Sequence, residues 1–256
     1  EAGIPHRVAH RNAMTTGPDA TPRHLRHLDR VQEFLKQIVY GGNDGIVTTF
    51  AIVAGFAGAG AGGTAQIGGI AVLLFGLANL FADAVSMGLG EFLSERSERE
   101  VWREQRAKAL ADIASNPDGE VRELAALIVK RGAAPEDADG LARALLRSPA
   151  LMAELSLSFD LGLTGPGKGS AGLRALVTFV AFVVFGSIPI LPYFLHDPAP
   201  GVFTASVAAT FGALALLGLL RWHATGERLA RALGETLVVG GICAVVAYLV
   251  GVLVGG

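Results

Sequence analysis

Residues 67–93 read IGGIAVLLFGLANLFADAVSMGLGEFL, an apolar run whose only charged residues are Asp83 and Glu91. A helix needs roughly 20 predominantly apolar residues to cross the hydrocarbon core of a bilayer, so this stretch is long enough to span a membrane. A carboxylate at membrane depth costs about 2.5–3.5 kcal/mol on insertion scales. The stretch therefore predicts a membrane-spanning helix whose acidic side chains have a functional role.

Four more segments have a similar length and apolar character, near residues 40–61, 172–195, 201–221 and 234–255. The chain has 256 residues, of which 51% are hydrophobic and 17% are charged, which is too apolar for a soluble domain. A net charge of −2 gives no argument for binding nucleic acid, which needs a basic surface. We expect an all-α polytopic membrane protein with five transmembrane helices in a lipid bilayer.

The first of these spans begins in an unusual way, with the sequence GGNDG at residues 41–45. Glycine weakens a helix, and irregular backbone inside a membrane is tolerated only where protein or a wet cavity satisfies it. We therefore expect the helix to be interrupted here, with a cavity close to Asp44.

The distribution of arginine and lysine predicts the orientation, because these residues gather on the cytoplasmic side. Basic residues precede the first span and separate the fourth from the fifth, whereas the connections 60–66 and 196–200 contain neither arginine nor lysine. We expect the amino terminus in the cytoplasm and the carboxyl terminus outside. The alanine-, glycine- and arginine-rich composition and the absence of a visible targeting segment favour a prokaryotic plasma membrane, with a vacuolar membrane as the alternative.

The hydrophilic block between the second and third spans then lies in the cytoplasm. Breaks at Asn116-Pro117, Gly132 and Ser148-Pro149 predict short helices over 97–114, 119–130, 136–146 and 151–161. We expect four parts: a cytoplasmic amino-terminal segment (1–36), transmembrane helices 1–2 (37–94), a cytoplasmic helical domain (95–171) and transmembrane helices 3–5 (172–256).

A polar column runs along the second span, since Asn79, Asp83, Met87 and Glu91 recur every four residues and share one helix face. Carboxylate oxygens bind divalent cations, and a thioether favours later transition metals such as Fe²⁺. Carboxylates also bind protons, so metal and protons can exchange at the same groups. With Asp44 from the first span, these residues form a candidate pathway.

Three residues of this pathway also have a structural explanation. Asp44 could cap an interrupted helix, Met87 could simply pack in an apolar interface, and Glu91 could be a hydrated helix end. In the hydrophilic block, Glu120 and Glu123 share a helix face and could converge with two aspartates, Asp112 and Asp160, as oxygen ligands. The alternative there is an ordinary solvated surface.

Three motifs resemble those of the vacuolar iron transporter family: YGGNDGIVTTFAIVAG at 40–55, GLAN at 76–79 and SMGLGE at 86–91. The resemblance extends from about residue 28 to the end of the chain. It implies a homodimer without a prosthetic group, whose first two spans line a path for ferrous iron, and often manganese, leaving the cytoplasm in exchange for protons. In this resemblance, Asp44 and Met87 match the metal-binding aspartate and methionine of the path.

The match to the family has departures. Many members have a glutamate where this chain has Asn79, and Asp83 lies one turn further along the same face. The family gathers metal in its cytoplasmic domain, where Glu120 and Glu123 match well and Asp112 and Asp160 match conservatively. Ala109 and Ser156 replace a glutamate and a methionine, so we expect a weaker or smaller cytoplasmic metal site.

The leading hypothesis is therefore a proton-coupled exporter of Fe²⁺ or Mn²⁺. A membrane-anchored metal sensor or scaffold, whose spans only dimerise, is the alternative. The carboxylates at membrane depth argue against an anchor, which has no reason to carry them. Oxygen and sulfur ligands also accept cobalt and zinc, so the order of metal preference stays open.

Overall fold

The computed structural model describes residues 23–60, 69–167, 169–195 and 200–255, and every regular element within them is helical. In chain order the elements are α1 (Arg23–Gly60), α2 (Gly69–Ser115), α3 (Pro117–Lys130), α4 (Pro135–Leu145), α5 (Pro149–Asp160), α6 (Ala171–Ser187), the 3₁₀ helix η1 (Ile188–Ile190), α7 (Leu191–Leu195), α8 (Pro200–Thr225) and α9 (Leu229–Gly255). The expectation of an all-α protein is confirmed.

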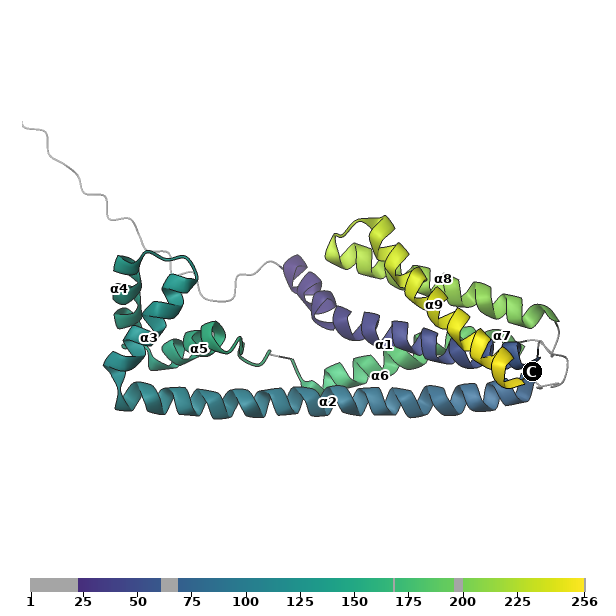
Figure 1. Cartoon of the computed structure of the whole chain (residues 1–256), viewed down its shortest axis with the longest axis horizontal. Coiled ribbons are helices and arrows are strands. Elements are labelled where there is room, and N and C mark those ends of the chain that lie inside the picture. The colour runs from purple at the N-terminus through teal and green to yellow at the C-terminus, as the bar shows by residue number, and fades with distance from the viewer. Residues whose placement is uncertain (1–22, 61–68, 168, 196–199, 256) are drawn as a thin grey trace, which may run out of the picture.

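Helix α2 runs along the whole length of the molecule and joins two groups of helices (Figure 1). The first part of α2 lies with α1 and α6–α9 in what we call the bundle. Helices α3, α4 and α5 pack at the far end of α2, and together with that end they form what we call the distal lobe. The molecule therefore separates an apolar region from a hydrophilic one along a single helix.

Helix α1 is the centre of the bundle, where α6 and α9 are its most extensive neighbours. An apolar core forms around it from α1, α2, α6 and η1, namely Phe50, Val53, Ala54, Val72, Leu80, Ala84, Phe182 and Ile190. Nearer the start of α1, Ile46 packs with Leu214 and Leu217 of α8. The glycine-rich part of α1 is thus surrounded by larger side chains of other helices.

The expected interruption of the first span is wrong, because α1 continues without a break through residues 41–45. The glycines here allow close contact between helices. A Cβ atom at Gly45 would lie 2.5 Å from the carbonyl oxygen of Phe182 in α6, and one at Gly41 would lie 2.7 Å from that of Thr178. Packing against α6 therefore outweighs the low helix propensity of glycine.

Glycines also set the contact between α1 and α9. A Cβ atom at Gly251 would overlap the carbonyl oxygen of Gly55, and one at Gly255 would collide with Ala59 at 2.5 Å. Small residues permit such close approach between membrane helices. Gly251 and Gly255 therefore allow α9 to pack closely against α1.

Four helices in the described part are long and apolar enough to cross a membrane, namely α2, the segment Ala171–Leu195, and the helices Gly201–Thr225 and Leu229–Gly255. They correspond to the second to fifth expected spans. Helix α1 is not among them, because its glycines, Asn43 and Asp44 lower its hydropathy, so five crossings stay a prediction. Residues 1–22, 61–68 and 196–199, on whose charges the expected orientation partly depends, lie outside the described residues.

Two more features of these spans are notable. The third expected span changes from α6 to the 3₁₀ segment η1 at Pro189, and Pro192 follows in α7. Large apolar side chains of α2 and α9 point away from the bundle; Ile70 and Leu253, for example, are both 82% exposed. Such surfaces are stable in lipid rather than in water.

The distal lobe has its own small core, which includes Ile113 of α2, Val121 and Leu124 of α3, and Met152 of α5. Each of its three short helices begins with a proline, whose fixed φ suits the first helical turn. These helices match the predicted ones. The segment 97–114 was predicted as a separate helix, but it is the end of α2 because no glycine or proline interrupts residues 94–115.

Candidate metal pathway and metal site

The polar column of α2 makes two hydrogen bonds, one within the column and one to α1. Asn79 Nδ2 donates to Asp83 Oδ2 at 2.6 Å, so these two side chains point toward each other along the column. Two turns further on, Glu91 Oε1 accepts a hydrogen bond of 2.9 Å from Gln37 Nε2 of α1. All four column residues are partly buried. The common face predicted from the four-residue spacing is therefore present and partnered.

Asp44 lies in the middle of α1, half-buried, and close enough to Asp83 to feel the charge of its carboxylate. Because α1 is continuous here, Asp44 does not cap a helix end, which removes the structural explanation considered above. The structure therefore brings together two acidic groups from α1 and α2 in the apolar bundle. Two like charges at such a place repel each other unless a cation or a proton neutralises them.

Met87 lies between the column and the apolar core. Its partly buried side chain packs against the cluster formed by Phe50, Leu80, Phe182 and their neighbours. Met87 therefore does pack in an apolar interface. Its thioether also lies one turn from Asp83 on the same face of α2, where it can contribute a soft ligand.

Glu95 is a member of the same column that the sequence reasoning missed. It follows Glu91 by four residues, and it is only 8% exposed. Its Oε1 atom lies 2.7 Å from Arg99 Nη2 and 3.4 Å from Arg174 Nη1 of α6. A buried carboxylate held by two arginines ties α2 to the start of α6.

The second oxygen of Glu95 has no hydrogen-bond partner among the described residues. It borders a cavity of about 190 Å³ lined by Glu98, Arg99, Trp102, Arg174 and the segment 164–167. The unchanged four-residue spacing was the signal that could have revealed Glu95. A hydrated helix end was the alternative for this part of α2. Arg174 of α6, which pairs with Glu95 instead, is distant in the sequence.

The expected ligands of the hydrophilic block lie around one cavity. Asp112 of α2, Glu120 and Glu123 of α3, and Asp160 of α5 all line a hollow of about 250 Å³ in the distal lobe. Ala109 and Ser156, the two residues that depart from the family pattern, line the same hollow. Within the described residues, no three acidic, histidine or cysteine side chains are close enough to hold a metal ion as they stand.

The acidic groups of this cavity influence one another. Burial raises the pKa of Glu120, and the negative charges of Glu123 and Asp112 raise it further. The charged form of Glu120 is therefore disfavoured without a bound cation. A divalent metal would reverse this, because its charge favours the ionised carboxylates.

Replacing Glu120 by glutamine is expected to stabilise the metal-free protein at neutral pH and to remove the stabilisation by Mn²⁺. The raised pKa means that Glu120 contributes most stability below its unfolded pKa and that this contribution is lost as the pH rises through the folded pKa. An amide has no charge to disfavour, so the melting temperature without metal should rise slightly, by at most the equivalent of about 0.5 kcal/mol because solvent screens a partly exposed carboxylate. Differential scanning fluorimetry between pH 5 and 8, with and without Mn²⁺, measures both effects.

The matched control for Glu120 is Glu104→Gln, which removes an exposed carboxylate of α2 that does not line the cavity. It should leave the response to Mn²⁺ as it is in the unaltered protein. If Mn²⁺ raised the melting temperature of the Glu120 variant as much as that of the unaltered protein, Glu120 would not be a ligand.

Comparison with known proteins supports the resemblance seen in the sequence. A family model described as the VIT family matches residues 35–252. A protein named vacuolar iron transporter 1 from Arabidopsis thaliana is 32% identical over 216 residues, which cover 84% of each chain. One named vacuolar iron transporter from Plasmodium berghei is 30% identical over 240 residues, or 90% of this chain and 86% of that one.

Proposed function

The chain belongs to the VIT family, and from this premise we propose that it is a proton-coupled transporter that carries Fe²⁺ out of the cytoplasm. The relatives are named as iron transporters, which supports metal-ion transport and not an enzymatic reaction. The observation that carries the proposal is the pair of carboxylates, Asp44 of α1 and Asp83 of α2, which lie close enough in an apolar bundle for their charges to interact.

The side chains available at this pair suit exchange. Each carboxylate can bind either a proton or one edge of a metal ion, so the arrival of one releases the other. Met87 adds a sulfur ligand one turn away, which favours Fe²⁺ over Mg²⁺ or Ca²⁺ while still accepting Mn²⁺. Asn79 and Glu91 extend the polar face on either side and line the path of the ion along α2.

We also propose that α1 crosses the membrane with the other four spans, although its hydropathy is lower. Its neighbours α6, α8 and α9 surround it with apolar side chains, so its polar residues need not meet lipid. The α8–α9 turn, with Arg221, Arg228 and Arg231, lies at the end of the bundle that points toward the distal lobe (Figure 1). This supports an assignment of both the lobe and the arginine-rich end to the cytoplasm.

The distal lobe is proposed to collect metal on the cytoplasmic side through Asp112, Glu120, Glu123 and Asp160. With Ser156 at the place of a methionine, the cavity offers oxygen ligands alone, which suit hard cations such as Mn²⁺ as well as Fe²⁺. Because no three of the acidic groups are close enough to hold an ion as they stand, binding requires them to move together. A weak site of this kind releases its ion easily.

A homodimer is the proposed assembly. A groove of about 820 Å³ on the outside of the bundle is lined by residues of α1, α2 and α9, among them Gly55, Phe56, Phe75, Asn79 and Val250. Asn79 brings a polar column residue to this otherwise apolar surface. A second copy seated here would enclose the column between two sets of α1 and α2.

The decisive experiment is uptake of Fe²⁺ by proteoliposomes that contain the purified chain and carry an imposed pH gradient. With the cytoplasmic side facing outward and the lumen acidic, Fe²⁺ should enter, and protons should leave at a rate that follows the metal. Collapsing the gradient with a protonophore should slow the uptake. A metal sensor or scaffold would bind Fe²⁺ without moving it, so the absence of any gradient-dependent flux would refute transport.

A further inference from the structure

A second groove, of about 700 Å³, opens between α1, α8 and α9 and does not include the column of α2. Its volume is within the range of about 300–1,000 Å³ that is typical of ligand pockets. The groove is lined by Leu35, Lys36, Val39, Tyr40, Asn43, Leu217, Arg221, Thr225, Glu235, Thr236 and Val239. None of these residues belongs to the proposed metal pathway, so the groove needs its own explanation.

The groove has a polar end and an apolar end. On α8, Leu217 lies one turn before Arg221, and Thr225 ends the helix; on α9, Glu235 lies one turn before Val239. The polar members of both helices are thus nearest the α8–α9 turn, and Lys36 is the charged residue of α1 in the same groove. A cavity that changes from charged to aliphatic along its length fits an amphiphile.

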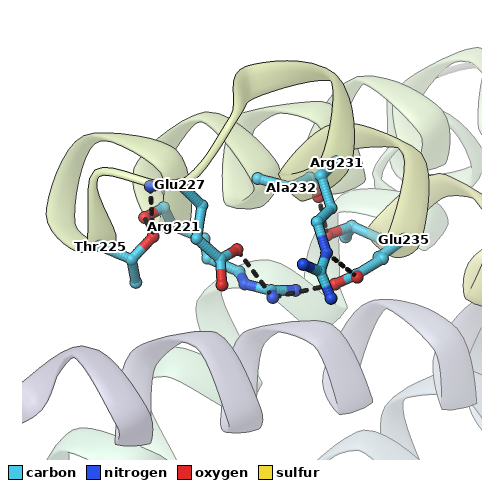
Figure 2. Close-up of polar contacts among 7 residues, drawn as sticks. Arg221, Thr225, Glu227, Arg231, Ala232 and Glu235 are labelled. Atoms are coloured by element: carbon cyan, nitrogen blue, oxygen red, sulfur yellow. Dashed lines mark hydrogen bonds and ion pairs between the residues drawn. The ribbon is translucent and has the colours of Figure 1, made fainter.

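The charged end is built around Arg221, as Figure 2 shows. Arg221 Nη2 lies 3.0 Å from Glu227 Oε2 and 2.9 Å from Glu235 Oε2, and Arg231 Nε lies 2.9 Å from Glu235 Oε1. Both carboxylates of this cluster are therefore already engaged by arginines. The cluster fixes the turn, and neither Glu227 nor Glu235 remains free to receive a positively charged headgroup.

One basic side chain of the groove remains available at the same end. Lys36 is exposed, and it forms no ion pair with any residue that the structure describes. The charged residues that line the groove are Lys36, Arg221 and Glu235, so basic groups outnumber acidic ones there. The surplus positive charge, placed where the helices end, is complementary to an anionic headgroup.

Aromatic side chains mark this end as the level of the membrane surface. Tyr40 in the groove is 64% exposed and Trp222 at the end of α8 is 40% exposed. Tyrosine and tryptophan favour the headgroup region because their rings are apolar and one edge is polar. The charged end of the groove therefore lies where lipid headgroups lie, and its apolar end extends toward the hydrocarbon.

We propose that this groove binds an anionic phospholipid, with the headgroup phosphate beside Lys36 and an acyl chain along Val39, Leu217 and Val239. A zwitterionic lipid is less well matched, because the glutamates that could hold its ammonium group are occupied. The proposal depends only on the groove and its charges, and it holds whether or not the chain transports metal.

Binding can be measured on the full-length chain in detergent by native mass spectrometry, with phosphatidylglycerol and phosphatidylcholine of the same acyl chains as probes. Phosphatidylglycerol should be retained at lower concentration and should raise the melting temperature more than phosphatidylcholine does. Lys36→Gln should weaken phosphatidylglycerol binding about fivefold, as expected for one basic group at a membrane surface. Val239→Trp, which fills the apolar end, should weaken both lipids.

The matched control is Lys130→Gln, which removes an exposed lysine in the distal lobe and should not alter lipid binding. Melting temperatures in phosphatidylcholine alone show that each variant is folded. Equal binding of the two lipids, or unchanged phosphatidylglycerol binding in Lys36→Gln, would overturn the proposal. So would equally strong stabilisation by inorganic phosphate, which would show an anion site with no need for a lipid chain.

Discussion

Replacing Asp44 by asparagine is expected to reduce gradient-driven Fe²⁺ uptake to the background of protein-free liposomes, a loss of at least about tenfold. The amide has the same size, so the contacts of α1 with α6 and α8 remain. It carries no charge for the metal and cannot exchange a proton in the physiological range. A tenfold loss corresponds to about 1.4 kcal/mol, less than the electrostatic energy of a divalent ion beside a half-buried carboxylate. The measurement is initial uptake in proteoliposomes with matched protein content.

The control for Asp44 is Asp118→Asn, the same chemical change at a side chain of the distal lobe that is 74% exposed and lies 3.8 Å from Arg143. Surface pairs of this kind contribute little, so uptake should stay close to that of the unaltered chain. If a folded Asp44→Asn protein retained more than half of the flux, the ion would have to cross elsewhere, and the proposed pair with Asp83 would be wrong.

Replacing Gly251 by alanine is expected to destabilise the bundle by about 1–3 kcal/mol, the usual consequence of adding a methyl group where there is no space. The new Cβ atom would overlap the carbonyl oxygen of Gly55, and it would also lie 3.0 Å from the backbone nitrogen of Ala59. Both contacts are with backbone, which cannot rotate away as a side chain can. The melting temperature in detergent should fall by several degrees.

Helix α9 offers its own control, because Gly241 has nothing within 4 Å of the position that a Cβ atom would occupy. Gly241→Ala should be neutral, or stabilising by up to about 1 kcal/mol, since alanine is the better helix former. Equal melting temperatures for the two variants would show that α1 and α9 are not in the close contact described above.

The sequence alone predicted the parts of the fold that depend on local pattern. Apolar length located the second to fifth spans, and proline and glycine located the short helices of the distal lobe. The continuity of α1 could not be read in the same way, because GGNDG is a poor helix locally and becomes helical through contact with α6. At Gly41 and Gly45, close packing against α6 outweighs the low helix propensity of glycine, because α6 leaves no space for a side chain at these positions.

The candidate sites show the same difference between features set by local sequence pattern and features set by contacts between helices. Four-residue spacing was sufficient to align Asn79, Asp83 and Glu91, because it needs only one helix. Partners from other helices, namely Gln37 of α1 at Glu91 and Arg174 of α6 at Glu95, were invisible without the fold. In the distal lobe the family resemblance indicated which acids gather, and the structure adds that they border a cavity without yet being close enough to hold an ion.

The single long helix α2 has a further consequence for how the two metal sites can cooperate. A continuous helix of 47 residues is about 70 Å long and does not fold back on itself. Asp112 and Asp83 lie on this same helix, so their separation along its axis is fixed at roughly 40 Å. If the lobe collects metal as we propose, an ion that it releases is not handed directly from ligand to ligand. It has to cross this distance through the surrounding solution before it reaches Asp83.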